Sequence, residues 1–249
     1  MTSTPSFPEL LSLIETRSEA LREAAGREAA DLRAGVPGCP GWSLRDLVRH
    51  LGGVHRFWAA AVTAADDSAP PAGVDRELRG DLLEWSAEST ALLLAALGAA
   101  GPDSPCWTWW ESSGAPMTAG AVARHQVQEA AVHAFDAQES AGKPEPIPAA
   151  IAVDGVGEFL TVGLGVRGAW PHRPARVAFQ AIEGPSWTLD LSPAGAHADP
   201  APSGDPVTRI QGTASDLVLV LYRRIALADV RVDGDRVVAE QLREWSVAD

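Results

Sequence analysis

Three side chains with metal-binding chemistry recur at helical spacing in the middle of the chain. His125, Glu129 and His133 follow one another at intervals of four residues, so on a helix they lie along one stripe of its surface. Two imidazoles and a carboxylate are costly to bury without partners, and coordination of a divalent ion such as Zn²⁺ would satisfy all three. The alternative is a salt-bridged, half-exposed helix face, and the spacing alone does not exclude it.

Two more histidines lie on an earlier segment with helical periodicity. The apolar stripe of this segment is centred near Leu51, and His50 and His55 flank it on opposite sides. Either side chain could reach a neighbouring helix, and periodicity does not choose between them. A single histidine on such a flank is usually structural.

The elements that must position these histidines follow from apolar spacing and capping residues. Apolar residues recur at helical intervals in the first part of the chain, and Ser43 followed by Asp46 is typical of a helix start. The pattern predicts helices over Phe7 to Ala34, Ser43 to Ala64, Val74 to Leu97 and Thr118 to Ala141. Such a set with modest connections favours a four-helix bundle.

The pattern changes near residue 145, where prolines at alternating positions force an extended segment. We therefore predict two domains, residues 1–145 and residues 146–249. For the second domain the pattern predicts helices at 151–163, 214–225 and 237–245 and strands at 175–182, 186–191, 207–211 and 228–232. This mixed order favours an α+β domain over a doubly wound sheet.

Composition limits the partners of the protein. The net charge is −13, from 20 basic and 33 acidic residues, which disfavours nucleic acid and anionic membranes because both require a basic face. No glycine-rich nucleotide-binding motif follows a predicted strand, so a nucleotide cofactor has no support. We expect a small-molecule substrate, while the oligomeric state stays open.

Several features of the chain bear on its location. No apolar run approaches the length of a membrane span, and the first residues lack the basic and apolar regions of a signal peptide. Cys39 and Cys106 are the only cysteines, so we expect no disulfide framework. Neither is needed as a nucleophile, and we predict a packing role for Cys39. A cytoplasmic location is the expectation.

Six blocks of sequence, in order along the chain, carry a resemblance to a known family. They are CPGWSLRDLVRHLGGVH at 39–55, QEAAVHAFD at 128–136, DGVGEFL at 154–160, SWTLDL at 186–191, GTASDL at 212–217 and VDGD at 232–235. Together they resemble the mycothiol-dependent maleylpyruvate isomerase family over almost the whole chain. This is far more specific than any single motif.

The resemblance implies a DinB-like four-helix bundle followed by a small α+β domain similar to sterol carrier proteins. It implies metal ligands at His50, Glu129 and His133, which favours His50 over His55 and leaves His125 as a neighbour. Whether His55 or His125 joins the site stays open on the residues themselves.

The chain also departs from the family pattern. Gln128 stands where the family commonly has a histidine, and Arg223 stands where the family commonly has the glycine of Leu-Trp-Gly-Arg. The arginine of that motif is retained as Arg224, which the resemblance makes a candidate catalytic residue. These departures leave the choice of substrate open.

The implied function is that of a metal-dependent, thiol-using enzyme. Two histidines and one glutamate would leave open positions on a zinc ion, as in catalytic sites, and a bound thiol would lose its proton near neutral pH. The resemblance supplies mycothiol as this low-molecular-weight thiol. Reversible addition to a small electrophile such as maleylpyruvate would give an isomerase, and lasting attachment would give an S-transferase. The alternative is a non-catalytic metal- or ligand-binding protein of the same fold.

Overall fold

The computed structural model describes residues 4–28, 30–199 and 204–246. They form two compact units. One unit comprises Pro5–Trp109 and Pro116–Glu145, and the other comprises Pro146–Asp249 together with the short segments Met1–Thr4 and Trp110–Ala115. A loop from the first half of the chain therefore belongs to the unit that the second half builds.

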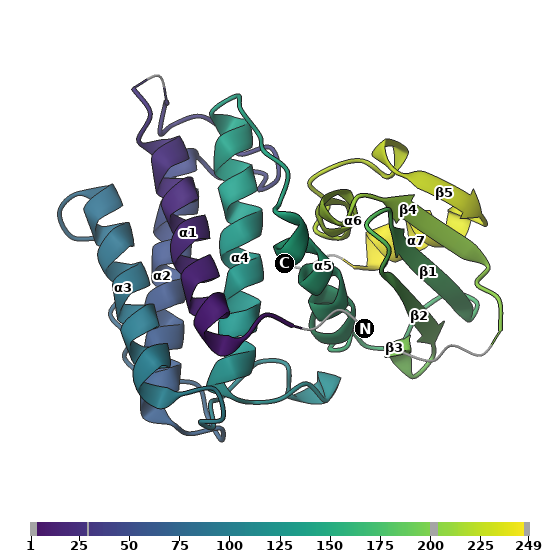
Figure 1. Cartoon of the computed structure of the whole chain (residues 1–249), viewed down its shortest axis with the longest axis horizontal. Coiled ribbons are helices and arrows are strands. Elements are labelled where there is room, and N and C mark those ends of the chain that lie inside the picture. The colour runs from purple at the N-terminus through teal and green to yellow at the C-terminus, as the bar shows by residue number, and fades with distance from the viewer. Residues whose placement is uncertain (1–3, 29, 200–203, 247–249) are drawn as a thin grey trace. The chain divides into compact units, whose positions relative to one another are not determined.

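The first unit is a bundle of long helices, drawn from purple to teal in Figure 1. Its helices are α1 (Phe7–Ala25), α2 (Leu44–Ala64), α3 (Leu82–Ala100) and α4 (Ala119–Ser140). Helix α1 packs mainly on α4, and α2 packs mainly on α3. The predicted helical bundle is confirmed.

Three boundaries of α1 and α3 differ from the prediction, and the smallest difference is the end of α3, at Ala100 instead of Leu97. Helix α1 stops at Ala25 instead of Ala34, with Gly26 as its C-cap. Helix α3 begins at Leu82 instead of Val74, because the carboxylate of Asp81 accepts hydrogen bonds from the first turn of the helix. Apolar residues beyond these caps lie in loops. Apolar spacing by itself does not distinguish such a loop from a continuing helix.

The core of the bundle pairs large side chains with small ones. The inner face of α4 contributes alanines, and α1 and α2 contribute leucines; the set includes Leu21, Leu44, Leu47, Leu51, Ala130, Ala134 and Ala137. Gly52 on α2 lies directly against the ring of Trp85 on α3, and a Cβ at Gly52 would overlap that ring. These small residues let the helices approach closely and hold the side chains of α2 and α4 in a fixed relation.

The second unit is built around a mixed sheet with strand order β3-β2-β1-β4-β5. The strands are β1 (Ala175–Ala181), β2 (Ser186–Ser192), β3 (Gly195–Asp199), β4 (Thr208–Gly212) and β5 (Arg231–Gly234). Strands β1 and β4 are parallel, and the other neighbours are antiparallel. The helices of this unit are α5 (Ala149–Glu158), α6 (Ala214–Leu221) and α7 (Arg236–Trp245).

The α+β fold class of this unit is confirmed, with local corrections. Strand β3 was not predicted, and β5 begins at Arg231 because Leu227–Asp229 forms a 3-10 turn instead of a strand. Helix α6 ends at Leu221, four residues before the predicted end at 225. The predicted helix 151–163 is present as α5 followed by a π-helical turn, Phe159–Gly163.

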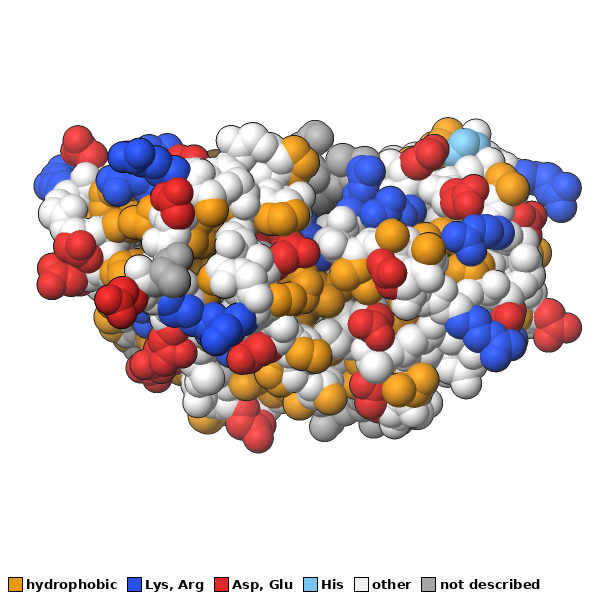
Figure 2. All heavy atoms as spheres, turned by 90° about the horizontal axis from the view of Figure 1, so that it is seen from above, with side chains coloured by type: hydrophobic (Ala, Val, Ile, Leu, Met, Phe, Trp, Pro, Cys, Tyr) orange, Lys and Arg blue, Asp and Glu red, His pale blue; other side chains and the backbone are white. Residues whose placement is uncertain are grey.

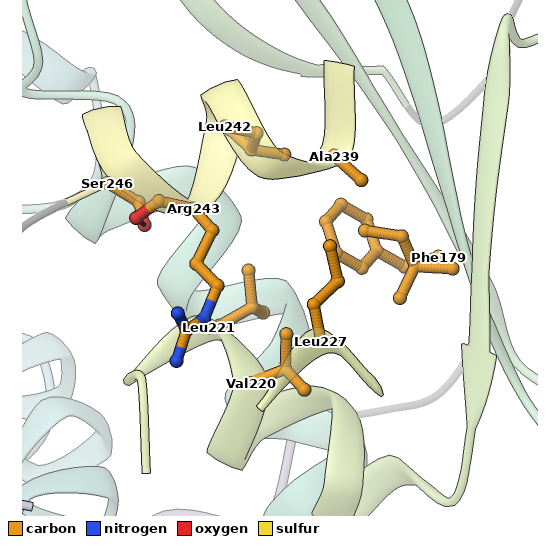
Figure 3. Close-up of a pocket in the computed structure, with 9 residues that line it drawn as sticks. Phe179, Val220, Leu221, Leu227, Ala239, Leu242, Arg243 and Ser246 are labelled. Carbon is orange, nitrogen blue, oxygen red and sulfur yellow. Dashed lines mark hydrogen bonds between the residues drawn. The ribbon is translucent and has the colours of Figure 1, made fainter. Parts of the chain in front are cut away.

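The sheet packs against α6 and α7 over an apolar core (Figure 3). Phe179 of β1 lies beside Ile210 of β4 and, with Leu242 of α7, lines the small cavity shown there. The cavity measures about 10 Å³, which is room for roughly one water molecule. Small-molecule pockets are typically about 300–1,000 Å³, so this cavity is far too small to hold a ligand.

The surface carries charges of both signs. Figure 2 shows lysine and arginine side chains in small groups, interspersed with aspartate and glutamate, on the face it displays. This agrees with the acidic net charge of −13. None of the described helices is long and apolar enough to cross a membrane.

Candidate functional site

Helix α2 receives its position from the loop that precedes it. Backbone hydrogen bonds join Cys39 to Val36, Trp42 to Cys39 and Val36 to Trp42, each at 3.0 Å. Ser43 then caps the helix, and its backbone N–H donates to the carboxylate of Asp46 at 3.0 Å. This capping box sets the helical phase, and the phase directs His50, two turns later, toward α4.

Helix α4 supplies the other side chains. Thr118 caps its first turn, and Glu129 and His133 lie one turn apart on the side that faces α2. Because i and i+4 side chains are neighbours on a helix surface, the carboxylate and the imidazole meet without any bend in α4.

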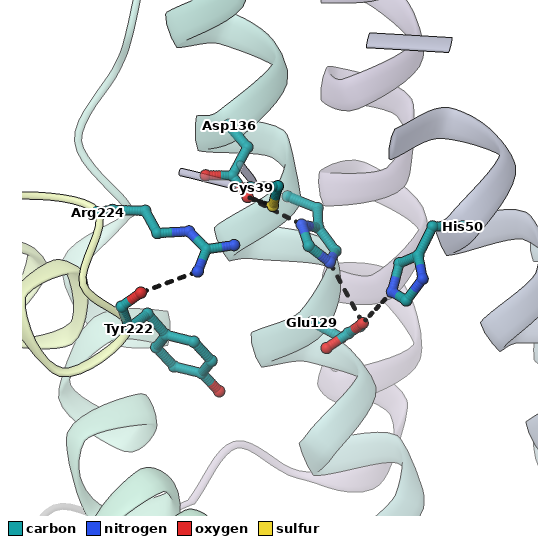
Figure 4. A network of polar contacts seen from close by, with 7 residues as sticks. Cys39, His50, Glu129, Asp136, Tyr222 and Arg224 are labelled. Carbon is teal, nitrogen blue, oxygen red and sulfur yellow. Dashed lines mark hydrogen bonds and ion pairs between the residues drawn. The ribbon is translucent and has the colours of Figure 1, made fainter. Parts of the chain in front are cut away.

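His50, Glu129 and His133 meet at a single carboxylate oxygen (Figure 4). Oε1 of Glu129 lies 3.0 Å from Nε2 of His50 and 3.3 Å from Nε2 of His133. The two imidazole rings stand edge to face, with centroids 5.1 Å apart. One ligand atom from each of the three residues lies within 4.8 Å of the other two. The three residues proposed from the resemblance therefore lie together, and we call them the His-Glu-His cluster.

Electrostatics tie Glu129 and His133 into an ion pair. Burial by itself would raise the pKa of Glu129, but the charge and hydrogen bonds of His133 and His50 outweigh it and hold that pKa well below its ordinary value. Burial likewise opposes the charge on His133, but Glu129 and the hydrogen bonds to Asp136 and Cys39 hold its pKa well above the ordinary value. The cluster therefore stabilises a positive charge on His133 beside the negative charge of Glu129.

Three further side chains surround the cluster. Trp42 lies against His50, with ring centroids 4.7 Å apart. Asp136 is fully buried, and its Oδ2 lies 2.9 Å from Nδ1 of His133. Sγ of Cys39 lies 3.7 Å from the same oxygen. The predicted packing role of Cys39 is confirmed, since it packs against the bundle core, but its contact with Asp136 was not predicted. The contact between Asp136 and His133 could have been predicted, because residues three apart are neighbours on a helix surface.

His55 and His125 lie elsewhere. His55 is fully buried, and its Nδ1 lies 3.2 Å from the hydroxyl of Thr90. His125 lies against two tryptophan rings, those of Trp58 and Trp109, at centroid distances of 6.4 Å and 5.4 Å. Among the described residues, neither histidine belongs to a group whose ligand atoms converge.

The residues at which the chain departs from the family pattern have clear local settings. Gln128 is fully buried inside the bundle. Arg223 follows the end of α6 with a φ of 63°, in the left-handed region that favours glycine. Arg224 lies in the second unit, where its Nη1 donates to the carbonyl of Tyr222 at 2.8 Å (Figure 4). Its catalytic role stays a prediction.

The donor set of the His-Glu-His cluster fits a divalent metal ion. Imidazole nitrogen and carboxylate oxygen are the ligands that Zn²⁺ accepts in catalytic sites. The side chains of His50 and Glu129 are 33% and 21% exposed, so an ion bound there would be reachable from solvent. Three protein ligands with solvent access leave room for a further ligand.

The fold and the cluster together define a class: a helical bundle that carries two histidines and a carboxylate, joined to a mixed-sheet α+β unit. Residues 11–138 match the family described as the mycothiol maleylpyruvate isomerase N-terminal domain, and residues 150–241 match the MDMPI C-terminal domain. The chain belongs to the mycothiol maleylpyruvate isomerase family.

Solved structures show the same fold. The chain is similar to the crystal structure of the mycothiol-dependent maleylpyruvate isomerase, with a TM-score of 0.57 and 16% identity over 88% of this chain and 91% of that one. A histidine-to-alanine mutant of that enzyme matches with a TM-score of 0.59 and 15% identity over the same shares. No curated protein matches the chain. The predicted family and fold class are confirmed, and the family includes an enzyme.

Proposed function

We propose that the protein is a metal-dependent, thiol-using enzyme that acts on a small electrophile, as a mycothiol-dependent isomerase or S-transferase. The observation that carries the proposal is the convergence of His50, Glu129 and His133 within 4.8 Å. The family and the crystallised relative, which is a mycothiol-dependent maleylpyruvate isomerase, supply the thiol and the substrate class.

In this proposal the cluster residues hold the ion. Nε2 of His50, a carboxylate oxygen of Glu129 and Nε2 of His133 are the ligand atoms. A bound divalent ion, zinc being the one we expect, would lower the pKa of a thiol held beside it. Glu129 would also offset part of the ion's charge, and the ring of Trp42 lies beside His50.

Arg224 is the proposed substrate-binding cation. A maleylpyruvate-like substrate carries carboxylates, and a guanidinium offers two parallel donors to a carboxylate, which an ammonium cannot. On a chain with a net charge of −13, a fixed cation at the site is needed to hold an anionic substrate. This role is inferred from the family motif and from chemistry.

The test compares turnover and metal content in matched variants. We expect wild type to consume maleylpyruvate, or a model electrophile, only with both mycothiol and metal present. His133→Ala should lose turnover, whereas His125→Ala, on the same helix outside the cluster, should keep it. Arg224→Lys should lower turnover by roughly 10-fold or more, because it loses the fork geometry, and should leave metal content unchanged.

Each outcome bears on a separate part of the proposal. Turnover that requires the metal but not the thiol would refute the thiol mechanism. Unchanged kinetics in Arg224→Lys would remove this arginine from the site. Metal-loaded wild type that turns over neither class of substrate would favour the alternative, a metal-binding protein without catalysis.

A further inference from the structure

His133 contacts carboxylates through both of its ring nitrogens. Its Nε2 lies 3.3 Å from Oε1 of Glu129, and its Nδ1 lies 2.9 Å from Oδ2 of Asp136. Sγ of Cys39 reaches the same Asp136 oxygen at 3.7 Å. The two carboxylates thus lie on different sides of the His133 imidazole. Nothing in the proposed function uses this second group.

Two interpretations fit a cysteine, a histidine and an aspartate in contact. Their ligand atoms lie within 4.8 Å of one another, so they could form a second metal position that shares His133. Alternatively, they could support His133 as a ligand of the first position. The two interpretations differ in where the protons of His133 and Cys39 reside.

The contacts favour the second interpretation, in which Asp136 and Cys39 support His133 as a metal ligand. A separation of 2.9 Å between Nδ1 and Oδ2 is a hydrogen bond, and an ionised carboxylate only accepts, so Nδ1 carries a proton. The thiol of Cys39 is a second donor to that oxygen. A metal ion in the same place would require removal of both protons, and it would leave His133 as an imidazolate.

Burial makes the arrangement rigid. The side chain of Asp136 is 0% exposed and that of His133 is 9% exposed. A buried carboxylate is costly unless it is paired and hydrogen-bonded, so Asp136 constrains the ring that pairs with it. While Nδ1 keeps its proton, a bound metal ion would replace the proton on Nε2, the atom that lies beside Glu129 and His50.

We infer that Asp136, supported by the thiol of Cys39, is a positioning residue that holds His133 in its Nδ1–H form and directs Nε2 at the metal. This inference rests on the proposed metal site. Partners of this kind behind a histidine ligand change metal affinity by about 10- to 100-fold. Asp136 acts through His133 and touches neither the ion nor the substrate.

The experiment measures zinc affinity and the tautomer of His133 in the full-length protein. Zinc affinity is obtained by chelator competition, and the tautomer from ¹⁵N chemical shifts of the imidazole in the zinc-loaded protein. The variants are Asp136→Ala, Asp136→Asn, which keeps the shape if the alanine variant does not fold, and Cys39→Ala. Asp154→Asn is the control, because Asp154 is also a buried carboxylate that accepts from a hydroxyl, that of Thr4, within the second unit.

We expect one zinc ion per wild-type chain and a proton on Nδ1 of His133. Asp136→Ala should weaken zinc binding by about 10- to 100-fold and Asp136→Asn by several-fold, with a smaller effect of Cys39→Ala. Asp154→Asn should bind zinc as wild type does.

Three results would overturn the inference, each in a different way. Wild-type affinity in Asp136→Asn would show that the carboxylate does not position His133. Two zinc ions per wild-type chain, one of them lost in Cys39→Ala, would establish a second metal position instead. A wild-type chain that binds no zinc would refute the proposed metal site itself, and this inference with it.

Discussion

Helix α2 carries two histidines, and each belongs to a different polar group inside the same bundle. His50 contacts Glu129 at 3.0 Å and joins the His-Glu-His cluster. His55, a turn and a half further on, contacts Thr90 of α3 at 3.2 Å, and Arg22 of α1 donates to the same hydroxyl at 3.1 Å. We call this second group the His55 network.

The two groups differ in the direct partner of each histidine, which is a carboxylate for His50 and a hydroxyl for His55. In the cluster, Glu129 stabilises a positively charged His133 and would equally stabilise a metal ion. In the His55 network, burial is the largest cause that lowers the pKa of His55 to about 3; the charge of Glu129 opposes this shift, and the charge of Arg22 adds to it. The two histidines of α2 thus differ in environment, because His50 contacts a carboxylate at 3.0 Å whereas His55 is fully buried against a hydroxyl.

The largest expected effect tests whether metal binding follows this difference. His50→Ala or His133→Ala should weaken zinc binding by at least about 100-fold, because two remaining ligands hold an ion poorly. His55→Asn should bind zinc as wild type does, since asparagine keeps a polar atom for Thr90. Chelator competition on the purified variants measures both. Loss of zinc in His55→Asn but not in His50→Ala would reverse the assignment of the two histidines.

The second effect concerns acid stability. The folded pKa of His55, about 3, lies below the ordinary value for an unfolded chain, about 6.5, so between these values the unfolded state binds the extra proton. The contribution of a neutral His55 is complete above pH 6.5 and is lost as the pH falls toward 3. The stability of wild type relative to His55→Asn should therefore fall by about 1.4 kcal/mol per unit from roughly pH 6 to pH 4.

Denaturant titrations of wild type and His55→Asn at each pH provide the measurement. The difference between the two proteins cancels the contribution of carboxylates that titrate in the same range. Parallel stability curves would mean that His55 is accessible to protons in the folded state, and the contrast with the cluster would then be lost.

A third effect tests whether both groups belong to the bundle alone. All of their residues lie before residue 145, so the predicted domain of residues 1–145 should bind about one zinc ion, as the whole chain does. The fragment should be less stable than the bundle within the whole chain, because Trp110, fully buried there, belongs to the segment that clusters with the second unit. Circular dichroism and zinc titration of the fragment measure these properties. A helical fragment without zinc affinity would show that the cluster needs the second unit.

Periodicity and capping predicted the elements that carry the site but could not select its members. Ser43 and Thr118 mark the starts of α2 and α4, and these starts fix the phase of each helix. The choice between His50 and His55 depends on how α4 is rotated toward α2, which is a property of packing and not of either helix by itself. The family resemblance favoured His50 as the metal ligand, and the structure places this residue beside Glu129.

Contacts between distant segments account for the rest. Cys39 and Asp136 are 97 residues apart in the sequence, so no local sequence pattern predicts their contact. Strand β3 reads Gly-Ala-His-Ala-Asp, which has little β propensity, and it forms because its backbone pairs with β2. In both cases the tertiary partner, and not the segment's own composition, decides the outcome.

The smallest effect concerns Arg223, in the second unit. Its φ of 63° lies in the left-handed region, which strains a residue with a Cβ by about 1–2 kcal/mol. Glycine would relieve this strain, but its greater freedom in the unfolded chain would offset part of the gain in stability. Arg223→Gly, which restores the family's residue, should therefore stabilise the protein by about 0.5–1 kcal/mol, measured by denaturant titration. Zinc affinity and the pH dependence of His55 should be unchanged, because both groups of the comparison lie in the bundle. Destabilisation would show that the exposed Arg223 side chain makes a contact worth more than the strain, and a change in zinc affinity would show that the end of α6 is coupled to the His-Glu-His cluster.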